Sequence, residues 1–361
     1  MLTSADEYLI HQSPWPVAYP DTSDRNFYDR YFFNGYSQDG QWYFALAMGV
    51  YPNLGVMDAA FSVLHGGRQR VVRASARLGD RMESRLGPIS VSVIEPFRRM
   101  RVEVEENKWG LAAHLEFRAR AVPFLEPHFF RRNHVGAVVM DYTRVTQHGS
   151  WEGSLSLDGA AVAVEPGGWL GTRDHSWGIR PVAGGDPRGA PPPAPPQFFW
   201  NWAPLHFDDR CVHYTVSEDA EGHPWHASGA LLSLLPSDKV EECAVEHALR
   251  FRPGTRHLEG GTIILRRRSG ELLEIDLEPL ATFLMRGIGY GDREWGHGVW
   301  KGELVVDGTE FDLSRTNPLE HPHVQHLVRA RSDGKEGIGA FELLVVGPHR
   351  PYGFRELMDP A

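Results

Sequence analysis

Apolar and polar residues alternate along much of this chain, in short segments that are separated by turn-forming residues. In the segment 100–107, Met100, Val102 and Val104 share one face, and the residues between them are charged. Successive side chains of a strand point to opposite faces, so this alternation indicates a strand with one buried and one solvated face. Such segments recur throughout the chain and helix signals are scarce, which predicts an all-β protein.

The expected strands are spread evenly over both halves of the chain, and helices are expected only at 125–134 and as a short turn near 312–317. The strands of the first half are expected at 42–51, 69–78, 89–97, 100–107, 111–121, 150–159 and 161–166. Those of the second half are expected at 211–219, 230–237, 246–254, 262–270, 272–280, 300–308 and 341–348. Evenly spaced strands joined by hairpin turns are typical of antiparallel barrels and sandwiches.

The length of the chain, 361 residues, exceeds what one ordinary hydrophobic core needs and fits two domains. A proline-rich segment at 184–197 separates the halves, and proline lacks the amide donor that a central strand requires. We therefore expect an N-terminal domain at 1–183, a linker or loop at 184–197 and a C-terminal domain at 198–361. The pattern D-x-x-W-G occurs at 174–178 and at 292–296, which favours two related halves.

The composition is that of a globular protein, with 42% hydrophobic and 23% charged residues. The formal net charge of −10 would repel a nucleic acid, so no nucleic-acid partner is expected. We expect no membrane span and no signal peptide, because no apolar run is long enough and the N-terminus lacks the signal pattern. Cys211 and Cys243 have no metal-type spacing and suit a reducing compartment, which predicts a cytoplasmic location.

Charged and aromatic residues cluster at the middle of the chain, in the stretch GTRDHSWGIR (171–180). In an extended segment, Asp174 and Ser176 would share one face, and Arg173, His175 and Trp177 would share the other. A carboxyl group that faces an aromatic cavity loses solvation, which raises its pKa and makes it a proton donor. The alternative is a buried ion pair between Asp174 and an arginine of the same stretch, which would fix a corner of the sheet.

A second stretch, GIGYGDREWGHGVW (287–300), places His297 between two glycines that allow close backbone approach. Tyr290, Trp295 and Trp300 supply aromatic faces that can stabilise a cation or stack on an unsaturated ligand. The alternative is a glycine-rich strand crossing whose aromatic rings fill the core.

Three histidines lie within EHPHVQH (320–326), a density that first suggests a metal. Pro322 interrupts this segment and no second group of ligands has matching spacing, so we expect a surface turn and no metal. The chain also lacks a phosphate loop, a dinucleotide fingerprint, a GxSxG elbow and an HExxH motif. We therefore expect no cofactor, and either proton-transfer chemistry or binding alone.

The stretch GTRDHSWGIR, followed by FFWNWAPLHFDD (198–209), resembles the lipocalin-like superfamily that contains carotenoid 1,2-hydratase (hydroxyneurosporene synthase) and the AttH-type proteins. It resembles the fungal Diels–Alderases more distantly. A bacterial branch of the superfamily is similar over nearly the whole chain, on the stretches YFFNGYSQDG (31–40), GVYPNLGVMDA (49–59), EWGHGVWKGE (294–303) and GIGAFELLVVGPHRPYGF (337–354).

The resemblance implies two tandem lipocalin-like antiparallel β-barrels or sandwiches with few short helices, and an apolar ligand cavity within or between them. It also implies that Asp174 is the proton donor. Ser176 stands where the hydratase usually has asparagine, and this departure leaves the substrate open.

Together these features predict a cofactor-independent acid–base enzyme that hydrates, dehydrates, isomerises or cyclises a hydrophobic, isoprenoid or steroid-like molecule. Asp174 would be the acid, and His175 or His297 would act as the base or position water. The remaining candidates would contact the substrate, although the two acids among them also fit a role as hydrogen-bonded core residues. They are Trp177, Arg180, Tyr290, Trp295, Trp300, Asp58 and Glu342.

A non-catalytic carrier of hydrophobic ligands is the alternative, because the same barrel fold serves both roles. An enzyme needs Asp174 in the cavity without an arginine partner, whereas a carrier needs only the cavity. A third interpretation, assembly with other subunits, rests on the aromatic residues of 198–207. The sequence is also compatible with a homodimer.

Overall fold

The computed structural model describes residues 2–182, 190 and 192–361, and most of its regular structure is β-strand. It confirms the predicted all-β class and the two barrel-like units. The helices of the described part are short 3-10 turns at Ser4–Glu7, Pro52–Leu54, Met285–Ile288, Pro318–Glu320 and Arg350–Tyr352. The helix expected at 125–134 is wrong, because Phe129–Arg132 forms a strand. Of the linker expected at 184–197, residues 184–189 and 191 lie outside the described residues.

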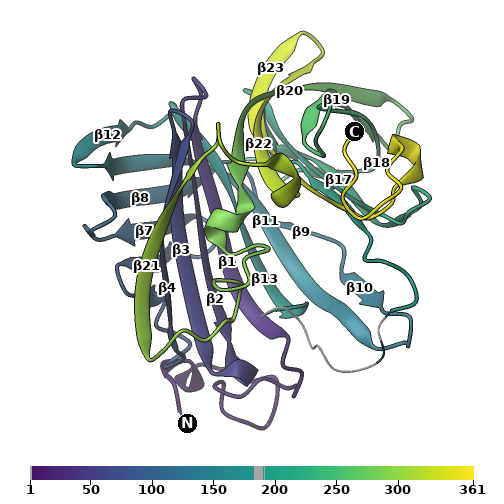
Figure 1. The fold of residues 1–361 in the computed structure, drawn as a ribbon. Coiled ribbons are helices and arrows are strands. Elements are labelled where there is room, and N and C mark those ends of the chain that lie inside the picture. The colour runs from purple at the N-terminus through teal and green to yellow at the C-terminus, as the bar shows by residue number, and fades with distance from the viewer. Residues whose placement is uncertain (1, 183–189, 191) are drawn as a thin grey trace.

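The first unit is an open 14-stranded antiparallel sheet that curves into half a barrel (Figure 1). Its main path runs β21-β4-β3-β2-β1-β13-β11-β8-β7-β6-β5, and β9, β10 and β12 pair with β11. The strands are β1 (Phe27–Ser37), β2 (Trp42–Tyr51), β3 (Val56–His65), β4 (Arg68–Arg77), β5 (Arg85–Leu86), β6 (Ile89–Glu95), β7 (Arg99–Val104), β8 (Leu111–Ala119), β9 (Phe124–Leu125), β10 (Phe129–Arg132), β11 (Val138–Leu157), β12 (Ala160–Val164), β13 (Trp169–Ile179) and β21 (Leu304–Asp312).

The second unit is a closed antiparallel barrel, because β17, the last strand of the order, pairs with β16, the second strand. That order is β14-β16-β15-β23-β22-β20-β19-β18-β17, and β14 also pairs with β23. The strands are β14 (Phe198–Trp202), β15 (Leu205–His206), β16 (Arg210–Glu218), β17 (Pro224–Ser233), β18 (Val240–Phe251), β19 (Leu258–Arg266), β20 (Leu272–Leu284), β22 (His323–Ser332) and β23 (Lys335–Val346).

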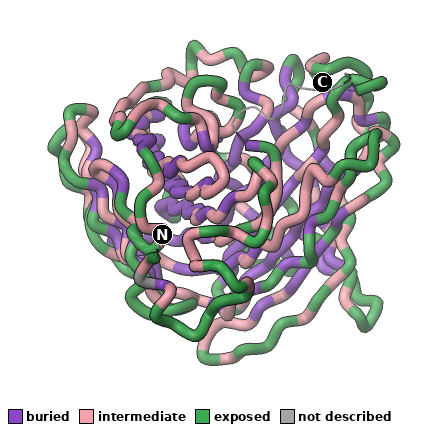
Figure 2. The backbone as a smooth tube through the Cα atoms, turned by 90° about the horizontal axis from the view of Figure 1, so that it is seen from below, coloured by how far each residue is buried: buried purple, intermediate pink, exposed green. Residues whose placement is uncertain are grey.

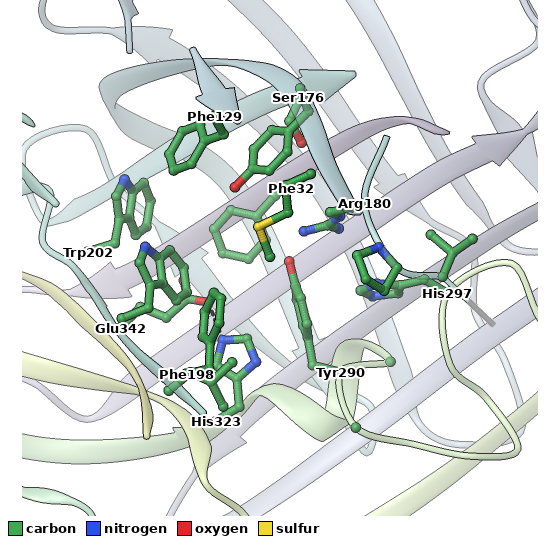
Figure 3. Close-up of a pocket in the computed structure, with 18 of the residues that line it drawn as sticks. Phe32, Phe129, Ser176, Arg180, Phe198, Trp202, Tyr290, His297, His323 and Glu342 are labelled. Carbon is green, nitrogen blue, oxygen red and sulfur yellow. Dashed lines mark hydrogen bonds and ion pairs between the residues drawn. The ribbon is translucent and has the colours of Figure 1, made fainter. Parts of the chain in front are cut away.

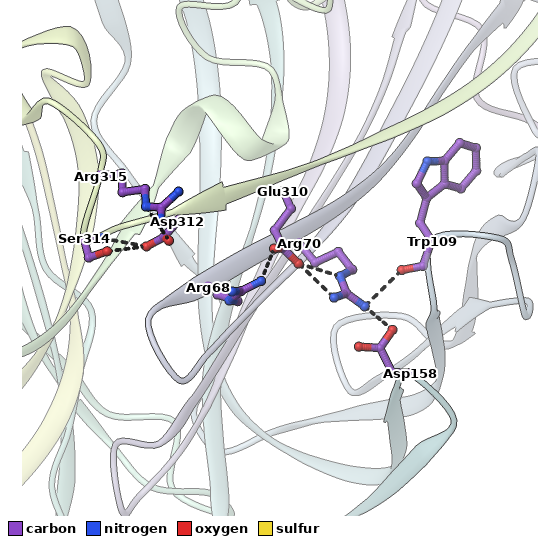
Figure 4. A network of polar contacts seen from close by, with 8 residues as sticks. All are labelled: Arg68, Arg70, Trp109, Asp158, Glu310, Asp312, Ser314 and Arg315. Carbon is purple, nitrogen blue, oxygen red and sulfur yellow. Dashed lines mark hydrogen bonds and ion pairs between the residues drawn. The ribbon is translucent and has the colours of Figure 1, made fainter.

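Strand β21 leaves the barrel and adds an edge to the first sheet, where it pairs with β4 along its whole length. Charged side chains line this join (Figure 4): Glu310 accepts hydrogen bonds from Arg68 and Arg70, each at 2.8 Å, and Arg70 also pairs with Asp158. These ion pairs are exposed and contribute little by themselves, so the backbone ladder holds the strand in place. The first sheet therefore takes a strand from the segment that the sequence assigns to the C-terminal half.

The two D-x-x-W-G stretches do not occupy equivalent positions in the fold. Residues 174–178 lie within β13, whereas residues 292–296 lie in a loop that follows the turn Met285–Ile288. The repeated D-x-x-W-G pattern therefore does not correspond to a structural repeat.

Buried side chains form three main clusters, and Figure 2 shows that the buried residues concentrate in the interior of the molecule. Trp151 is at the centre of the first cluster, where its ring lies 5.2–5.8 Å from those of Phe33, Phe44 and Phe117. The second fills the barrel with leucine, valine and phenylalanine. The third joins Phe32 of the first sheet to barrel residues such as Phe283, so the two units share a hydrophobic interface.

A buried chain of hydrogen bonds crosses the same interface. The side-chain amide of Asn34 in β1 donates to Gln325 in β22 at 3.2 Å, and the Tyr43 hydroxyl donates to the same oxygen. Gln325 in turn donates to Glu342 of β23 at 2.6 Å, and Glu342 also hydrogen-bonds His323 at 2.6 Å. Because buried polar groups require partners, this chain fixes the orientation of the barrel on the sheet.

Replacing Trp151 with alanine should destabilise the protein severely, since the ring is only 1% exposed and contacts three aromatic neighbours. Loss of a buried tryptophan costs about 3–5 kcal/mol of unfolding free energy. Urea denaturation followed by circular dichroism would measure it. Trp15→Ala is the control, because Trp15 is 63% exposed and should change stability by less than about 0.5 kcal/mol. Equal effects of the two substitutions would contradict the assignment of Trp151 to the core.

Candidate functional site

A cavity of about 490 Å³ lies between the first sheet and the barrel, a volume in the range of small-molecule sites. In Figure 3, Phe129, Trp202 and Phe198 lie on one side of it, and Arg180, Tyr290 and His297 on the other. Both units contribute to the lining. The first sheet contributes Phe32, Phe129, Met140, Tyr142, Arg144, Asp174 and Ser176; the barrel strands contribute Phe198, Trp200, Trp202, Ser217, Trp225, His323, Glu342 and Leu344.

Asp174 faces this cavity from β13, in register with Phe32 on one neighbouring strand and Thr146 on the other. Burial raises the pKa of its carboxyl group to about 6, although the nearby cations of Arg144, Arg30 and Arg180 oppose the shift. Within the described residues the carboxyl group has no hydrogen-bond or ion-pair partner. It is therefore a carboxylic acid with proton-donating capacity near neutral pH.

The arginines nearest to Asp174 along the chain and in space are engaged elsewhere. Arg173 points to the opposite face of the strand and donates to Gln147 at 2.9 Å. Arg144 lines the cavity but forms a bidentate pair with the buried Glu126, with both contacts at 2.7 Å. The buried ion pair of Asp174 with Arg173 or Arg180, which the sequence offered as the alternative, is not formed with either arginine.

Alternation along β13 turns His175 and Trp177 away from the cavity. His175 hydrogen-bonds Asp29 at 2.7 Å and lies against the ring of Tyr31, and Trp177 is 37% exposed. Neither residue lines the cavity, so the structure does not bring them together with Asp174.

Tyr290, Arg180 and His297 do line the cavity, as the sequence analysis expected of site residues. The Tyr290 hydroxyl accepts a hydrogen bond of 2.6 Å from Arg30 of β1. The Arg180 guanidinium lies over the same ring, 5.6 Å from its centroid, and 4.6 Å from that of Tyr28. At this end of the cavity, two arginine side chains, Arg30 and Arg180, therefore contact the phenol of Tyr290.

His297 is held as a neutral ring beside Tyr290, with the two ring centroids 4.4 Å apart. Burial lowers the pKa of His297 well below its usual value, and the charges of Arg30 and Arg180 lower it further. Its Nε2 donates to the carbonyl oxygen of Ile288 at 3.0 Å, so Nδ1 carries the free lone pair. A neutral imidazole with an unprotonated nitrogen is equipped to accept a proton.

Glu342 also lines the cavity, within the hydrogen-bond chain that joins the two units. Its partner His323 lies in strand β22 and is 8% exposed, so the surface turn expected at 320–326 is wrong. Pro322 stands just before the strand, where a missing amide donor interrupts no ladder. In the part of the chain that the structure describes, these histidines do not form a metal-binding group.

Asp58, Trp295 and Trp300 lie outside the main cavity. The Asp58 carboxylate accepts a hydrogen bond of 2.6 Å from the Gly298 amide, and burial raises its pKa to about 6. Trp295 lies under the guanidinium of Arg73, and Trp300 is 45% exposed. These three residues anchor the loop of 289–303 against the first sheet.

The aromatic wall of the cavity was not assigned from the sequence. Phe198, Trp200 and Trp202 belong to FFWNW, which the sequence analysis connected with subunit assembly. The structure turns these residues toward the cavity, with Trp202 only 1% exposed, so they do not form a flat exposed patch. The spacing of Phe198, Trp200 and Trp202 at every second position was a sequence signal that they share one strand face. The sequence did not indicate what that face contacts, because Arg144, which lies over both indoles, comes from a distant strand.

The fold and the cavity define an all-β protein of two barrel-like units with a ligand-sized cavity between them. The chain belongs to a family described as "Family of unknown function (DUF8625)", whose model matches residues 2–355. No curated protein matches the sequence. None of the described helices has the length and apolar character needed to cross a membrane.

Several solved structures share this fold. An AttH-type protein from Nitrosomonas europaea is 16% identical, with a TM-score of 0.56 over 88% of this chain and 92% of that chain. Kievitone hydratase from Nectria haematococca is 11% identical, with a TM-score of 0.52 over 88% of each chain. CghA is 13% identical, with a TM-score of 0.50 over 90% of each chain. At these identities the likeness shows the fold.

Two aspartate carboxyl resonances should titrate near pH 6 in protein labelled with ¹³C-aspartate, because burial raises the pKa of both Asp174 and Asp58. Asp174→Asn should remove one resonance and Asp58→Asn the other. Between about pH 4 and 6 the unfolded chain releases these protons before the folded chain, so the unfolding free energy should fall as the pH rises through that window. A titration of Asp174 below pH 4 would show that the carboxyl group is ionised and paired.

Proposed function

We propose that this protein is an acid–base enzyme of the hydratase, dehydratase, isomerase or cyclase type that acts on a hydrophobic small molecule. The observation that carries the proposal is Asp174, a partnerless carboxyl group with a raised pKa in a cavity with aromatic walls. Kievitone hydratase, which shares the fold, is named for a hydratase activity, and this supports the proposal. Fold likeness alone does not decide between an enzyme and a carrier.

In the proposed reaction, Asp174 as a neutral acid donates its proton to an unsaturated carbon of the substrate. The faces of Phe32, Trp200 and Trp202 surround the carbon skeleton and stabilise positive charge that develops on it. The free Nδ1 of His297 then accepts a proton, either from water that adds to the cation or from a neighbouring carbon. Addition of water gives hydration, and loss of a carbon-bound proton gives isomerisation or ring closure.

Arg144 and Glu126 support this site without donating a proton. Their buried bidentate pair places the guanidinium over the rings of Trp200 and Trp202, 5.6 Å from each centroid. Since Glu126 compensates the charge of Arg144, Asp174 does not have to. We therefore assign Arg144 and Glu126 a positioning role.

The substrate we propose is isoprenoid or steroid-like, as the resemblance to carotenoid 1,2-hydratase implies, and no cofactor takes part. The proposal places the protein in the cytoplasm, where its thiols at Cys211 and Cys243 would remain free. The carrier is the competing function, and it requires the cavity but not the acid.

Deuterium transfer from heavy water into a panel of terpenoid, steroid and polyene compounds tests the proposal. Wild type should incorporate label into at least one compound, and Asp174→Asn should reduce the rate by about 10²–10⁴-fold at equal binding. The wild-type rate should fall as the pH rises above about 6, because the acid form of Asp174 is then lost. Asp29→Asn, on the opposite face, is the matched control. Tight binding without label in any variant would identify a carrier.

Substitution of His297 and of His175, the two histidines predicted from the sequence as base candidates, should affect kcat differently. His297→Gln should lower kcat by about 10²-fold or more, because glutamine cannot accept the proton that the proposed reaction transfers to Nδ1 of His297. His175→Gln should leave kcat nearly unchanged, since His175 lies outside the cavity. The comparison uses the compound identified by deuterium transfer. A larger effect of His175→Gln would place the base on the other face of β13.

A further inference from the structure

Two guanidinium groups, those of Arg30 and Arg180, meet at the Tyr290 end of the cavity, and neither has a carboxylate partner within residues 2–182, 190 and 192–361. Arg30 is 3% exposed, and its Nη1 donates to the Tyr290 hydroxyl at 2.6 Å. Its Nε and Nη2, together with Nη2 of Arg180, have no hydrogen-bond partner among the residues that the structure describes. A buried guanidinium without partners is costly, so the pair needs an explanation beyond packing.

The other charged groups near the cavity, apart from the exposed Arg293, have partners. Glu126 compensates Arg144, and Asp292 pairs with Arg73 at 3.3 Å and with Arg286 at 3.5 Å. Apart from the exposed Arg293, Arg30 and Arg180 are therefore the cations at the cavity that have no ion-pair partner among the residues that the structure describes.

The carboxyl groups nearest to these two cations do not balance them. Glu342 is bound by His323 and Gln325, and Asp58 by the Gly298 amide and the Tyr51 hydroxyl. Asp174 must be protonated to act as the acid. In the catalytic protonation state the Tyr290 end of the cavity therefore carries an excess of positive charge, and a negative group on the ligand would compensate it.

We propose that the ligand of this cavity carries an anionic oxygen on an otherwise apolar body, and that Arg180, backed by Arg30 and Tyr290, binds that oxygen. This inference rests on the proposed function and narrows its substrate class to apolar acids: carboxylates, enolates or acidic phenols. Figure 3 shows Arg180 and Tyr290 side by side and the aromatic rings of Phe129 and Trp202 across the cavity. The anionic oxygen and the apolar body of one molecule would each meet a matching surface.

Arginine suits this role because its planar, permanently charged group presents several donors to one or two oxygens. Stacking of Arg180 over Tyr28 fixes the plane of its guanidinium in advance. The hydrogen bond from Arg30 fixes Tyr290 in the same way. Little conformational freedom is therefore lost when the anionic oxygen binds.

Two probes that differ by a single charged group test the subsite: 8-anilinonaphthalene-1-sulfonate and N-phenyl-1-naphthylamine, which has the same rings without the sulfonate. Their dissociation constants would be measured by fluorescence with the full-length protein. In Arg180→Gln the sulfonate probe should bind about 10-fold more weakly or worse, as expected for loss of a charge-assisted hydrogen bond. The neutral probe should bind as to wild type, which also shows that the cavity remains intact.

Two further variants locate the effect. Arg293→Gln removes the same charge from an exposed residue of the lining and should change the ratio of the two affinities by less than about 2-fold. Met140→Trp fills the cavity and should weaken both probes. An equal loss for both probes in Arg180→Gln, or an equal change of ratio in Arg293→Gln, would overturn the anionic subsite and leave the proposed function standing. Failure of wild type to bind either probe would reject both.

Discussion

The hydrogen bonds that Asn34 makes are the contact on which the rest of this structure depends. Its side-chain oxygen accepts from the Thr172 amide of β13 at 2.7 Å, while its amide nitrogen reaches Gln325 of the barrel. Its backbone carbonyl accepts from the indole of Trp151. One buried residue therefore links the core of the first sheet, the strand that carries Asp174 and the barrel. Because the cavity lies between the two units, its dimensions follow from this attachment.

The chemistry at Asp174 depends on a balance of opposed electrostatic effects. Burial favours the neutral carboxyl group, and three nearby arginines favour the carboxylate; the resulting pKa is about 6. The bidentate pairing of Arg144 with Glu126 offsets the effect of the Arg144 charge on Asp174. A buried ion pair that stabilises little by itself therefore helps to keep a neighbouring acid protonated.

Local alternation made much of the fold predictable. The strand expected at 42–51 coincides with β2, and the two faces expected for 174–178 are those observed. Strand β22 was missed because Pro322 and the histidines resembled a turn, although the proline only precedes the strand. The pairing of β21 with β4 joins residues more than 200 positions apart, and no local pattern encodes it. The strand face of Asp174 could be predicted because alternation is local, whereas the approach of Arg30, Trp200 and Trp202 to the cavity depends on contacts between distant strands.

The location of the cavity follows from how the barrel is filled. Lipocalin-type barrels often hold their ligand inside the ring of strands, but here leucine, valine and phenylalanine side chains occupy that interior. The space for a ligand lies instead where the barrel meets the half-barrel, and two different surfaces line it. The first sheet contributes Asp174, and β14 of the barrel contributes the indoles of Trp200 and Trp202. A site divided in this way needs both units in register, which explains why polar, geometrically demanding contacts rather than apolar packing alone hold them together.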